Sequence, residues 1–407
     1  MIEMQKDQNM KDITSKSTTE IPKSVQSICA VHGVRAAGTR DGKFGLSLIQ
    51  ATGDSAAVFT KNIVIAEPVR LMKERMQQGR LSGIIVNSGC ANVLTGERGY
   101  QDALSMAECA ADVIQVDAKE IGVASTGVIG RYLDLPLITK QCKSLTGTLG
   151  NTPKCEYAAA DGILTTDLFQ KHALIQTDEF SIGGICKGSG MIAPNMGTML
   201  AFIYTDAEIG AEQLQSALRS AVDHSFNMVV VDGDTSTNDA TFLTATGEAG
   251  RVDPTLFQDA LSSCCISLAR QIAIDGEGAS KLITVRVRGT KTIEEARLAA
   301  WTIAASPLVK TAVYGEDPNW GRIIAAAGRS GCEFDVNAIS CWIGNDDARA
   351  VVCKEGVINP DLSSAKSLMK GKEVVIELDL AGGTESATAW GCDLTEGYID
   401  INGRYTT

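Results

Sequence analysis

The sequence predicts a mixed fold of the α/β or α+β class. Short apolar runs of strand length alternate with amphipathic segments of helical periodicity along its 407 residues. The 40 glycines supply many tight turns between them, and no internal repeat or low-complexity block interrupts the alternation. At roughly 100–200 residues per domain, this length predicts two domains, or one large domain and a smaller one.

The expected elements follow one another in regular order. Helical patterns cover 100–116, 207–224, 254–274 and 293–305. Strand-like runs cover 82–86, 120–124, 228–231, 282–288 and 373–380. Thr292 and Glu295 have the spacing of a capping box at the start of the last helix. Because 282–288 alternates apolar with polar residues, we expect that strand to be half exposed.

The charge of the chain is acidic, with 49 Asp and Glu against 37 Lys and Arg. A nucleic-acid binder would present a basic face, so the net charge of −12 argues against that class. No apolar run approaches the ~18–20 residues of a membrane-spanning helix. Residues 1–24 are polar and lack the apolar core of a signal peptide, so we expect a flexible tail on a cytoplasmic protein.

The cysteines and the acidic or glycine-rich runs match no usual metal or cofactor motif. The 12 cysteines are scattered without a Cys-x-x-Cys pair, and the three histidines supply no zinc spacing. We expect most of these cysteines to be buried small hydrophobic residues in a reducing compartment. The run 232–239 lacks the Glu of a calcium loop, and 187–190 and 276–281 lack the Walker spacing and the dinucleotide fingerprint. Neither a metal nor a cofactor is therefore expected.

The most informative stretch is 187–202, where a glycine-rich turn and Pro194 lead to Gly197, Thr198 and an apolar, strand-like run. A threonine hydroxyl is a weak nucleophile that needs a base nearby. If the Gly197–Thr198 bond breaks, Thr198 gains an α-amino group with a reference pKa of about 7.7–8.0, partly neutral near pH 7. Gly197 would ease the attack on its carbonyl, because glycine tolerates strained backbone angles. By pattern alone, a turn that enters a buried strand is the commoner structure.

Further blocks accompany this junction in a fixed order along the chain. They are Val-Asn-Ser-Gly-Cys-Ala-Asn at 86–92, Ala-Ser-Thr-Gly-Val-Ile-Gly at 124–130, Ile-Leu-Thr-Thr-Asp at 163–167, and the segments 232–239, 275–281, 317–322 and 401–407. With 187–206 as the central motif, the chain from about residue 30 to its end resembles the ornithine acetyltransferase family, also called bifunctional glutamate N-acetyltransferases. The family usually has alanine where Gly197 stands. The smaller glycine permits the same turn and leaves the rate of cleavage open.

The resemblance implies layers of helices around β-sheets, similar to N-terminal-nucleophile hydrolases, with a smaller C-terminal subdomain. It implies self-cleavage between Gly197 and Thr198 into an alpha chain, 25–197, and a beta chain, 198–407, that begins with the nucleophile. Two copies of each chain are expected to form a heterotetramer. No cofactor is implied, and acetyl-CoA would be a co-substrate only in a bifunctional enzyme.

The resemblance also implies the roles of the site residues. Thr198 would be the nucleophile, and Thr126 and Gly127, on a turn after a strand, would form the oxyanion hole. The substrate contacts would be Thr165, Lys187, Thr198, Glu277, Asn402 and Thr407. Lys187 is suited to a substrate carboxylate and Glu277 to an amine of ornithine, and Thr165 is preferred to Thr166. From the residues alone, Lys187 is a solvated loop lysine, and the others are turn or terminal residues.

These residues together favour a two-step acyl transfer. Thr198 would take the acetyl group from N2-acetyl-L-ornithine and release ornithine, and L-glutamate would then leave as N-acetylglutamate, in cyclic arginine biosynthesis. Two alternatives stay open. One is an N-terminal-nucleophile aminopeptidase or amidase, in which water replaces glutamate. The other is an uncleaved small-molecule binding protein in which Thr198 is only a strand residue. Neither nucleic acid nor a membrane is an expected partner.

Overall fold

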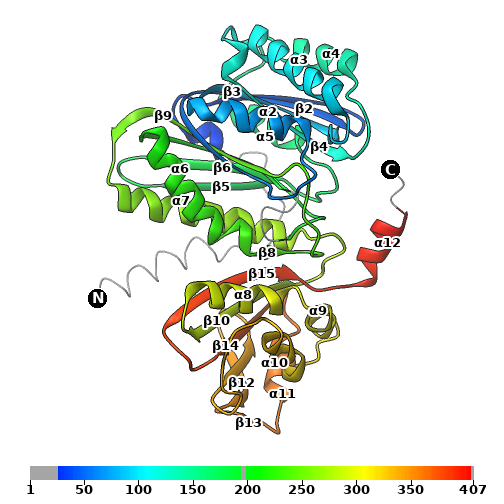
Figure 1. Ribbon diagram of the computed structural model, residues 1–407, viewed down its shortest axis with the longest axis vertical. Helices are drawn as coiled ribbons and strands as arrows, with labels where there is room; N and C mark the ends of the chain where they lie inside the picture. The colour runs from blue at the N-terminus through cyan, green and yellow to red at the C-terminus, as the bar shows by residue number, and fades with distance from the viewer. Residues whose placement is uncertain (1–25, 194–198, 405–407) are drawn as a thin grey trace.

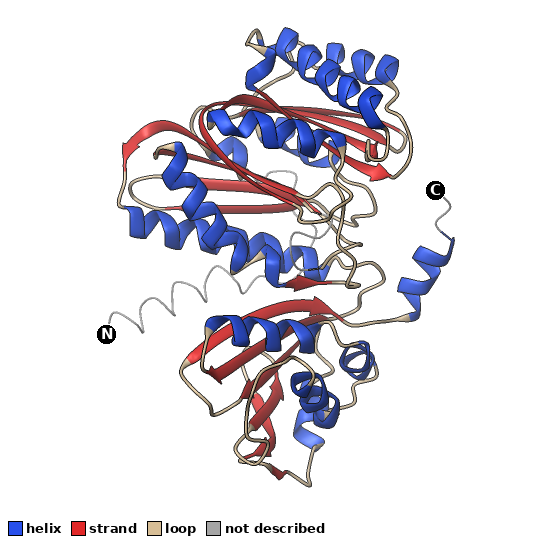
Figure 2. Ribbon diagram, in the orientation of Figure 1, coloured by secondary structure: helices blue, strands red, loops and turns tan. Residues whose placement is uncertain are grey.

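The structure, a computed structural model, describes residues 26–193 and 199–404. The predicted tail 1–24, the junction residues Gly197 and Thr198, and Thr407 lie outside the described residues. The described part forms two β-sheets, one above the other in Figure 1, with helices packed against both. The fold is therefore mixed α/β, as predicted, and Figure 2 shows its helices and strands in layers.

The first sheet has eight strands and combines segments from both sides of 194–198. Its path is β4-β3-β2-β9-β7-β6-β5, and β1 pairs with β2 beside this path. The strands are β1 (Arg35–Asp41), β2 (Phe44–Phe59), β3 (Arg80–Cys90), β4 (Ile121–Val128), β5 (Lys171–Gln176), β6 (Ser181–Lys187), β7 (Leu200–Glu208) and β9 (Ala240–Arg251).

The long strand β2 joins two halves of this sheet. Its first part pairs with β1 and β3 and its last part with β9, and the register shifts between Gln50 and Gly53. Buried side chains from both halves, such as Val86 of β3 and Phe202 of β7, belong to one hydrophobic cluster. The two halves therefore share a core, which accounts for their stacking in Figure 1.

Helices pack against both halves of the first sheet. They are α2 (Glu67–Arg75), α3 (Gly96–Ile114), α4 (Leu135–Ser144), α5 (Pro153–Gly162), α6 (Ala211–Asp223) and α7 (Pro254–Ile274), with short 3-10 helices at Ile28–Ala30, Met76–Gln78, Ala118–Glu120 and Phe226–Met228. α3 packs on β3 and β4, α5 on β1 and β2, and α7 on β5 and β6. α7 also contacts β15 of the second sheet, so its buried side chains belong to a core that both sheets share.

The second sheet builds the smaller C-terminal part of the molecule. Its order is β13-β12-β11-β14-β10-β15-β8. The strands are β8 (Val229–Val230), β10 (Leu282–Thr290), β11 (Ser340–Gly344), β12 (Arg349–Lys354), β13 (Val357–Ile358), β14 (Glu373–Asp379) and β15 (Glu385–Cys392). The helices are α8 (Ile293–Ala304), α9 (Pro307–Tyr314), α10 (Trp320–Gly328), α11 (Ser363–Leu368) and α12 (Glu396–Arg404). The short segment 393–395 connects β15 to α12, which in Figure 1 lies beside the two sheets, near the C-terminus.

Most of the predicted elements are confirmed. The predicted helix 254–274 coincides with α7, because Asp253 caps its first turn and Pro254 occupies the first helical position. Both hydrogen bonds of the predicted capping box between Thr292 and Glu295 are present at the start of α8. The other confirmed predictions overlap with β3, α3, β4, β7, β8, β10 and β14.

Two of these predictions were wrong in part. The helix predicted from Ala207 begins at Ala211, because Ala207 still pairs with Gly250 in the sheet. The strand 282–288 is not half exposed: most of β10 is buried, and Arg288 is exposed. This burial follows from the position of β10 between β14 and β15, with α8 packed against it.

The predicted cleavage point falls between two neighbouring strands. β6 ends at Lys187, β7 begins at Leu200, and these two residues are register partners. β7 also pairs with β9, so it lies inside the sheet. The predicted alpha and beta chains would therefore share one sheet, and backbone hydrogen bonds would hold them together after cleavage.

The twelve cysteines all lie in the described part of the chain, and each is a free thiol. Nine of them are buried, which confirms that most pack as small hydrophobic residues. Within residues 26–193 and 199–404, no helix combines the length and the apolar character that a membrane crossing requires.

Candidate active site

The predicted site residues that the structure describes lie on segments that meet beside the ends of β4 and β6. Thr126 and Gly127 are near the end of β4, and Lys187 is the last residue of β6. Glu277 follows α7, and Asn402 belongs to α12. Hydrogen bonds between these segments, set out below, join residues that are more than 60 positions apart in the chain.

The predicted oxyanion residues lie inside β4, near its end, and not on a turn after the strand as predicted, because β4 continues in register with β3 to Val128. Thr126 is buried, and Gly127, with φ of +130°, is a register partner of Gly89 in the parallel strand β3. A Cβ atom at Gly127 would lie 2.3 Å from the carbonyl carbon of Gly89 and 2.5 Å from the nitrogen of Cys90. This end of β4 therefore requires glycine at position 127, for both its backbone angle and its space.

Gly127→Ala is expected to lower both stability and activity. The new methyl group would collide with the β3 backbone and strain φ, at a cost of about 1–3 kcal/mol or more. Gly130→Ala is the matched control, because Gly130 also has positive φ, +77°, but its Cβ would meet no atom within 4 Å. Thermal unfolding and acetyl-transfer assays should show a larger loss for Gly127→Ala; equal losses would contradict the packing argument.

Lys187 is buried instead of solvated, although an isolated loop lysine would face water. Its side chain donates from Nζ to Oγ1 of Thr126 over 3.3 Å. Burial lowers the pKa of Lys187, and the charges of Asp167, Asp239 and Glu277 oppose this shift. The structure thus places a buried lysine, whose pKa is lowered, directly beside the predicted oxyanion threonine.

Glu277 and Asn402 meet although they are 125 positions apart. Nδ2 of Asn402 donates to Oε2 of Glu277 over 2.9 Å, and the backbone N–H of Glu277 donates to the carbonyl of Ser189 over 2.8 Å. A Cβ atom at Gly190 would lie 2.4 Å from the carboxyl carbon of Glu277, so a larger residue there would displace this carboxylate. Asn402, one of the predicted substrate contacts, therefore connects the C-terminal helix α12 to Glu277.

Thr165 and Thr166 differ in how their hydroxyl groups are used. The hydroxyl of Thr166 is hydrogen bonded to that of Ser189 over 2.7 Å. Thr165 is exposed, and its backbone N–H donates to Oδ2 of Asp167 over 3.2 Å. In the described part of the chain, no hydrogen bond of the Thr165 hydroxyl is present, so this group is available to a ligand.

Two aspartates hold the chain on either side of the segment 194–198. Asp239 is fully buried and accepts from the backbone N–H of Met199 over 2.9 Å; burial raises its pKa well above the usual range. Asp232 accepts from the N–H groups of Met191, at 2.6 Å, and Ile192, at 3.0 Å. Met191 has φ of +56°, which is uncommon outside glycine, so Asp232 stabilises a strained turn.

The acidic block 232–239 therefore uses its carboxylates to bind backbone N–H groups. Across residues 26–193 and 199–404, no group of three or more His, Cys, Asp or Glu side chains is arranged to hold a metal ion. Asn238 of the same block donates to the carbonyls of Ala91 and Ser125, and so joins the segment before β9 to the loop after β3 and to β4 itself. Sequence reasoning assigned no role to Asp232, Asn238 or Asp239; their signal was a dense run of polar residues in a matched block.

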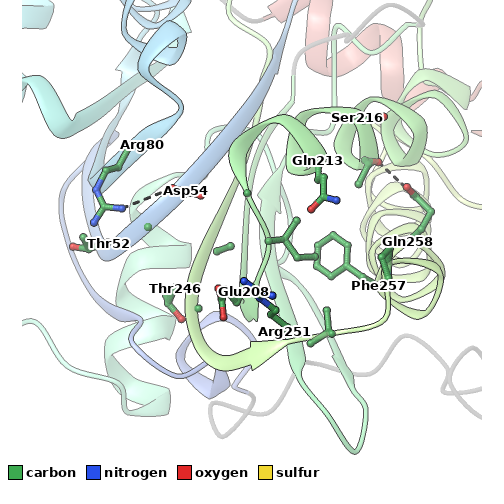
Figure 3. Close-up of a pocket in the computed structure, with 18 residues that line it drawn as sticks. Thr52, Asp54, Arg80, Glu208, Gln213, Ser216, Thr246, Arg251, Phe257 and Gln258 are labelled. Atoms are coloured by element: carbon green, nitrogen blue, oxygen red, sulfur yellow. Dashed lines mark hydrogen bonds and ion pairs between the residues drawn. The ribbon is translucent and has the colours of Figure 1, made fainter.

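A cavity lies elsewhere, at the opposite ends of the strands (Figure 3). It has a volume of about 740 Å³ and is lined by the bulge of β2, the ends of β7 and β9, and the first turns of α6 and α7. Its charged side chains already face each other, Arg80 with Asp54 at 3.8 Å and Arg251 with Glu208 at 3.7 Å. All four are at least 45% exposed, so they form ordinary surface pairs.

Fold and site together define a mixed α/β protein with two sheets and a polar, partly buried site at one end of the first sheet. The chain belongs to the ArgJ family, whose model matches residues 30–407. This match confirms the family resemblance of the sequence blocks.

Similar proteins from an archaeon and a bacterium align with nearly the whole chain, and a solved structure aligns with about half of it. The glutamate N-acetyltransferase of Methanosarcina mazei is 50% identical over 389 residues, which are 93% of this chain and 98% of that protein. The arginine biosynthesis bifunctional protein ArgJ of Symbiobacterium thermophilum is 45% identical over 91% of this chain and 94% of its own length. The crystal structure of the bifunctional ArgJ protein of Bacillus halodurans is 42% identical over 49% of this chain and 96% of that one, with a TM-score of 0.47.

Proposed function

We propose that this protein is a glutamate N-acetyltransferase of arginine biosynthesis that moves the acetyl group of N2-acetyl-L-ornithine to L-glutamate. The observation that carries the proposal is the convergence of Thr126, Lys187, Glu277 and Asn402: Lys187 binds Thr126, Asn402 binds Glu277, and the charge of Glu277 acts on Lys187. Family membership, with a glutamate N-acetyltransferase at 50% identity, supports the same activity.

The reaction has two steps through an ester of Thr198. After cleavage, the α-amino group of Thr198 takes the proton of its own hydroxyl, and the oxygen attacks the acetyl carbonyl of acetylornithine. The amide C–N bond then breaks, and the ornithine nitrogen leaves with that proton. Glutamate repeats the sequence in reverse: its amine attacks the acetyl ester, and the Thr198 hydroxyl is restored as N-acetylglutamate leaves.

Thr126 and Gly127 would stabilise the negative oxygen of both tetrahedral intermediates. Oγ1 of Thr126 accepts a hydrogen bond from Lys187, so its own proton is free to be donated in another direction. A preset donor of this kind stabilises a transition state by about 2.7–4 kcal/mol. The positive charge of Lys187 adds to this effect and suits a substrate carboxylate.

Glu277 and Asn402 would bind the amine side of the substrate. The Glu277 carboxylate has one oxygen engaged by Asn402, which orients it for an ammonium group of ornithine. Thr165 is favoured over Thr166 as a further contact, because the hydroxyl of Thr166 is already bonded to Ser189. Thr407 remains a proposed contact from the family resemblance.

The proposed enzyme is made by self-cleavage of the Gly197–Thr198 bond into alpha and beta chains that stay paired through β6 and β7. Two of each chain would form a heterotetramer. The cytoplasm is the proposed location, which fits twelve free thiols.

The deciding assay mixes acetylornithine with glutamate and follows N-acetylglutamate. Its formation, with ping-pong kinetics, is the expected result. Hydrolysis that does not depend on glutamate would favour the aminopeptidase or amidase instead. If the chain stays intact, binds ornithine and shows no turnover, a binding protein would be favoured. Repeating the assay with acetyl-CoA as the donor decides whether the enzyme is bifunctional.

Glu277→Gln is expected to raise the KM for acetylornithine about tenfold to a hundredfold, because a hydrogen bond to a charged group contributes about 1.5–3 kcal/mol. The kcat should change less, since the oxyanion residues are untouched. Glu333→Gln is the control, because Glu333 is 86% exposed and pairs with Lys291 away from the site. An unchanged KM in Glu277→Gln would remove Glu277 from the substrate contacts.

A further inference from the structure

We propose that Lys171 is a positioning residue for substrate binding, because it ties together the loops of Thr165 and Glu277 and the end of β6 at Lys187. We call Asp167, Lys171 and Asp275 the ion triad. The inference deepens the proposed function of the site and rests on it.

Lys171 is the centre of the ion triad and has no access to solvent. Its Nζ lies 2.7 Å from Oδ1 of Asp167, 2.5 Å from Oδ2 of Asp275 and 3.3 Å from the carbonyl of Phe169. All three side chains of the triad are 0% exposed. Three acceptors match the three N–H donors of the ammonium group, so the buried cation is fully satisfied.

Asp167 connects the triad to two of the substrate segments. Its Oδ1 accepts from the backbone N–H of Gly188 over 2.6 Å, directly after Lys187. Its Oδ2 accepts from the backbone N–H of Thr165 over 3.2 Å. One carboxylate therefore sets the distance between the loop with the free threonine hydroxyl and the end of β6.

Asp275 connects the triad to the third segment. Both of its oxygens accept from the backbone N–H of Leu168, at 3.2 and 3.1 Å. Two residues further along the chain stands Glu277, in the loop after α7. Lys171 thus holds the loop after α7 against the loop before β5, and the carboxylate of Glu277 depends on that contact.

The electrostatics make Lys171 the member on which the other two depend. Burial opposes the charge of Asp167, yet Lys171 and Lys187 hold its pKa below the usual range. Burial raises the pKa of Asp275 to about 6, and Lys171 opposes that rise. Without Lys171, two buried carboxylates would face each other with no cation between them, so one would take up a proton or the loops would separate, and either change alters the contacts that hold the loops.

A buried ion triad is a weak source of stability, because desolvation offsets much of its attraction. Apolar side chains of similar size would hold a core equally well. The carboxylate oxygens of this triad also accept from the backbone N–H groups of Thr165, Leu168 and Gly188, and these contacts do more than add stability. They fix the relative positions of groups that must contact one small molecule, and displacements near 1 Å in such sites change rates by about a hundredfold.

The test compares Lys171→Met, Asp275→Asn and the double variant in the acetyl-transfer assay. We expect Lys171→Met to raise the KM for acetylornithine by about tenfold to a hundredfold, with a much smaller change in kcat. Asp275→Asn should change KM in the same direction. The double variant should be no worse than Lys171→Met alone, because the two residues act as one unit.

Arg270→Met is the matched control. Arg270 lies on α7 and binds Glu373 of β14 at 3.0 Å, on the side of the second sheet. This variant should lower Tm without changing KM. A lowered Tm with wild-type KM in Lys171→Met would overturn the inference and leave the triad a purely structural feature.

Two further outcomes separate this inference from the proposed function. If Lys171→Met does not fold, Asp275→Asn carries the test, because it is nearly isosteric. If the wild-type protein transfers no acetyl group, the proposed function fails, and the affinity for ornithine, measured by calorimetry, replaces KM. Equal affinities of wild type and Asp275→Asn for ornithine would then overturn the positioning role of the triad.

Discussion

Thr198→Ala is expected to abolish both cleavage of the chain and acetyl transfer. The hydroxyl of Thr198 is the proposed attacking group in both reactions, first on the carbonyl of Gly197 and then on the acetyl group of the substrate. Removing a catalytic nucleophile typically lowers kcat on the order of 10⁶-fold. Denaturing mass spectrometry should detect one chain of 43.0 kDa in the variant. The wild type should give two fragments of about half that mass, the second beginning at Thr198.

Thr198→Ser is the control, because it keeps a hydroxyl and loses a methyl group. It should still cleave and turn over, at reduced rates. A Thr198→Ala variant that retains acetyl transfer would refute the nucleophile, whereas an uncleaved but fully active wild type would refute the need for a free α-amino group. Comparing Gly197→Ala with the wild type would measure how much the glycine before Thr198 changes the rate of cleavage.

The parts of the fold that depend on neighbouring residues could be predicted from the sequence. α7 has a capping aspartate and a proline at its start and begins where these residues stand. The start of α6 was missed, because Gly210 gives no side-chain cap and Ala207 and Glu208 suit a helix as well as a strand. The burial of β10 was missed for a different reason. Its neighbours β14 and β15 lie far along the chain, with Leu282 paired to Glu373 in one and to Cys392 in the other. A local sequence pattern cannot predict such partners.

The candidate site divides in the same way. The matched blocks predicted which segments carry Thr126, Lys187, Glu277 and Asn402, and the structure brings these segments together. The burial of Lys187 and the central role of Lys171 could not be predicted, because both depend on contacts between distant segments. The Lys171–Asp275 pair spans 104 positions. Physical partners of that kind become visible only when the sheet and the loops around it are assembled.

Thr126→Val is expected to lower kcat by about 10²–10³-fold, because it removes one donor from the oxyanion hole. Valine has nearly the shape of threonine, so the end of β4 beside Gly89 should be preserved. Lys187 would lose the hydroxyl that accepts its hydrogen bond, and a buried group without its partner costs about 1–3 kcal/mol or more. A lower Tm should therefore accompany the loss of activity, while KM changes little because the substrate contacts remain.

Thr126→Ser separates the two roles of this side chain. Serine keeps an acceptor for Lys187 and a donor for the oxyanion, so both Tm and kcat should recover most of their wild-type values. Thr126→Val should slow both half-reactions, because both pass through the same type of tetrahedral intermediate. Single-turnover measurements with acetylornithine would follow formation of the acetyl ester, and measurements with glutamate would follow its breakdown. Cleavage of the chain should slow as well if the same donor stabilises its intermediate. A Thr126→Val variant with wild-type kcat would assign the oxyanion to backbone N–H groups alone and leave Thr126 as the partner that holds Lys187.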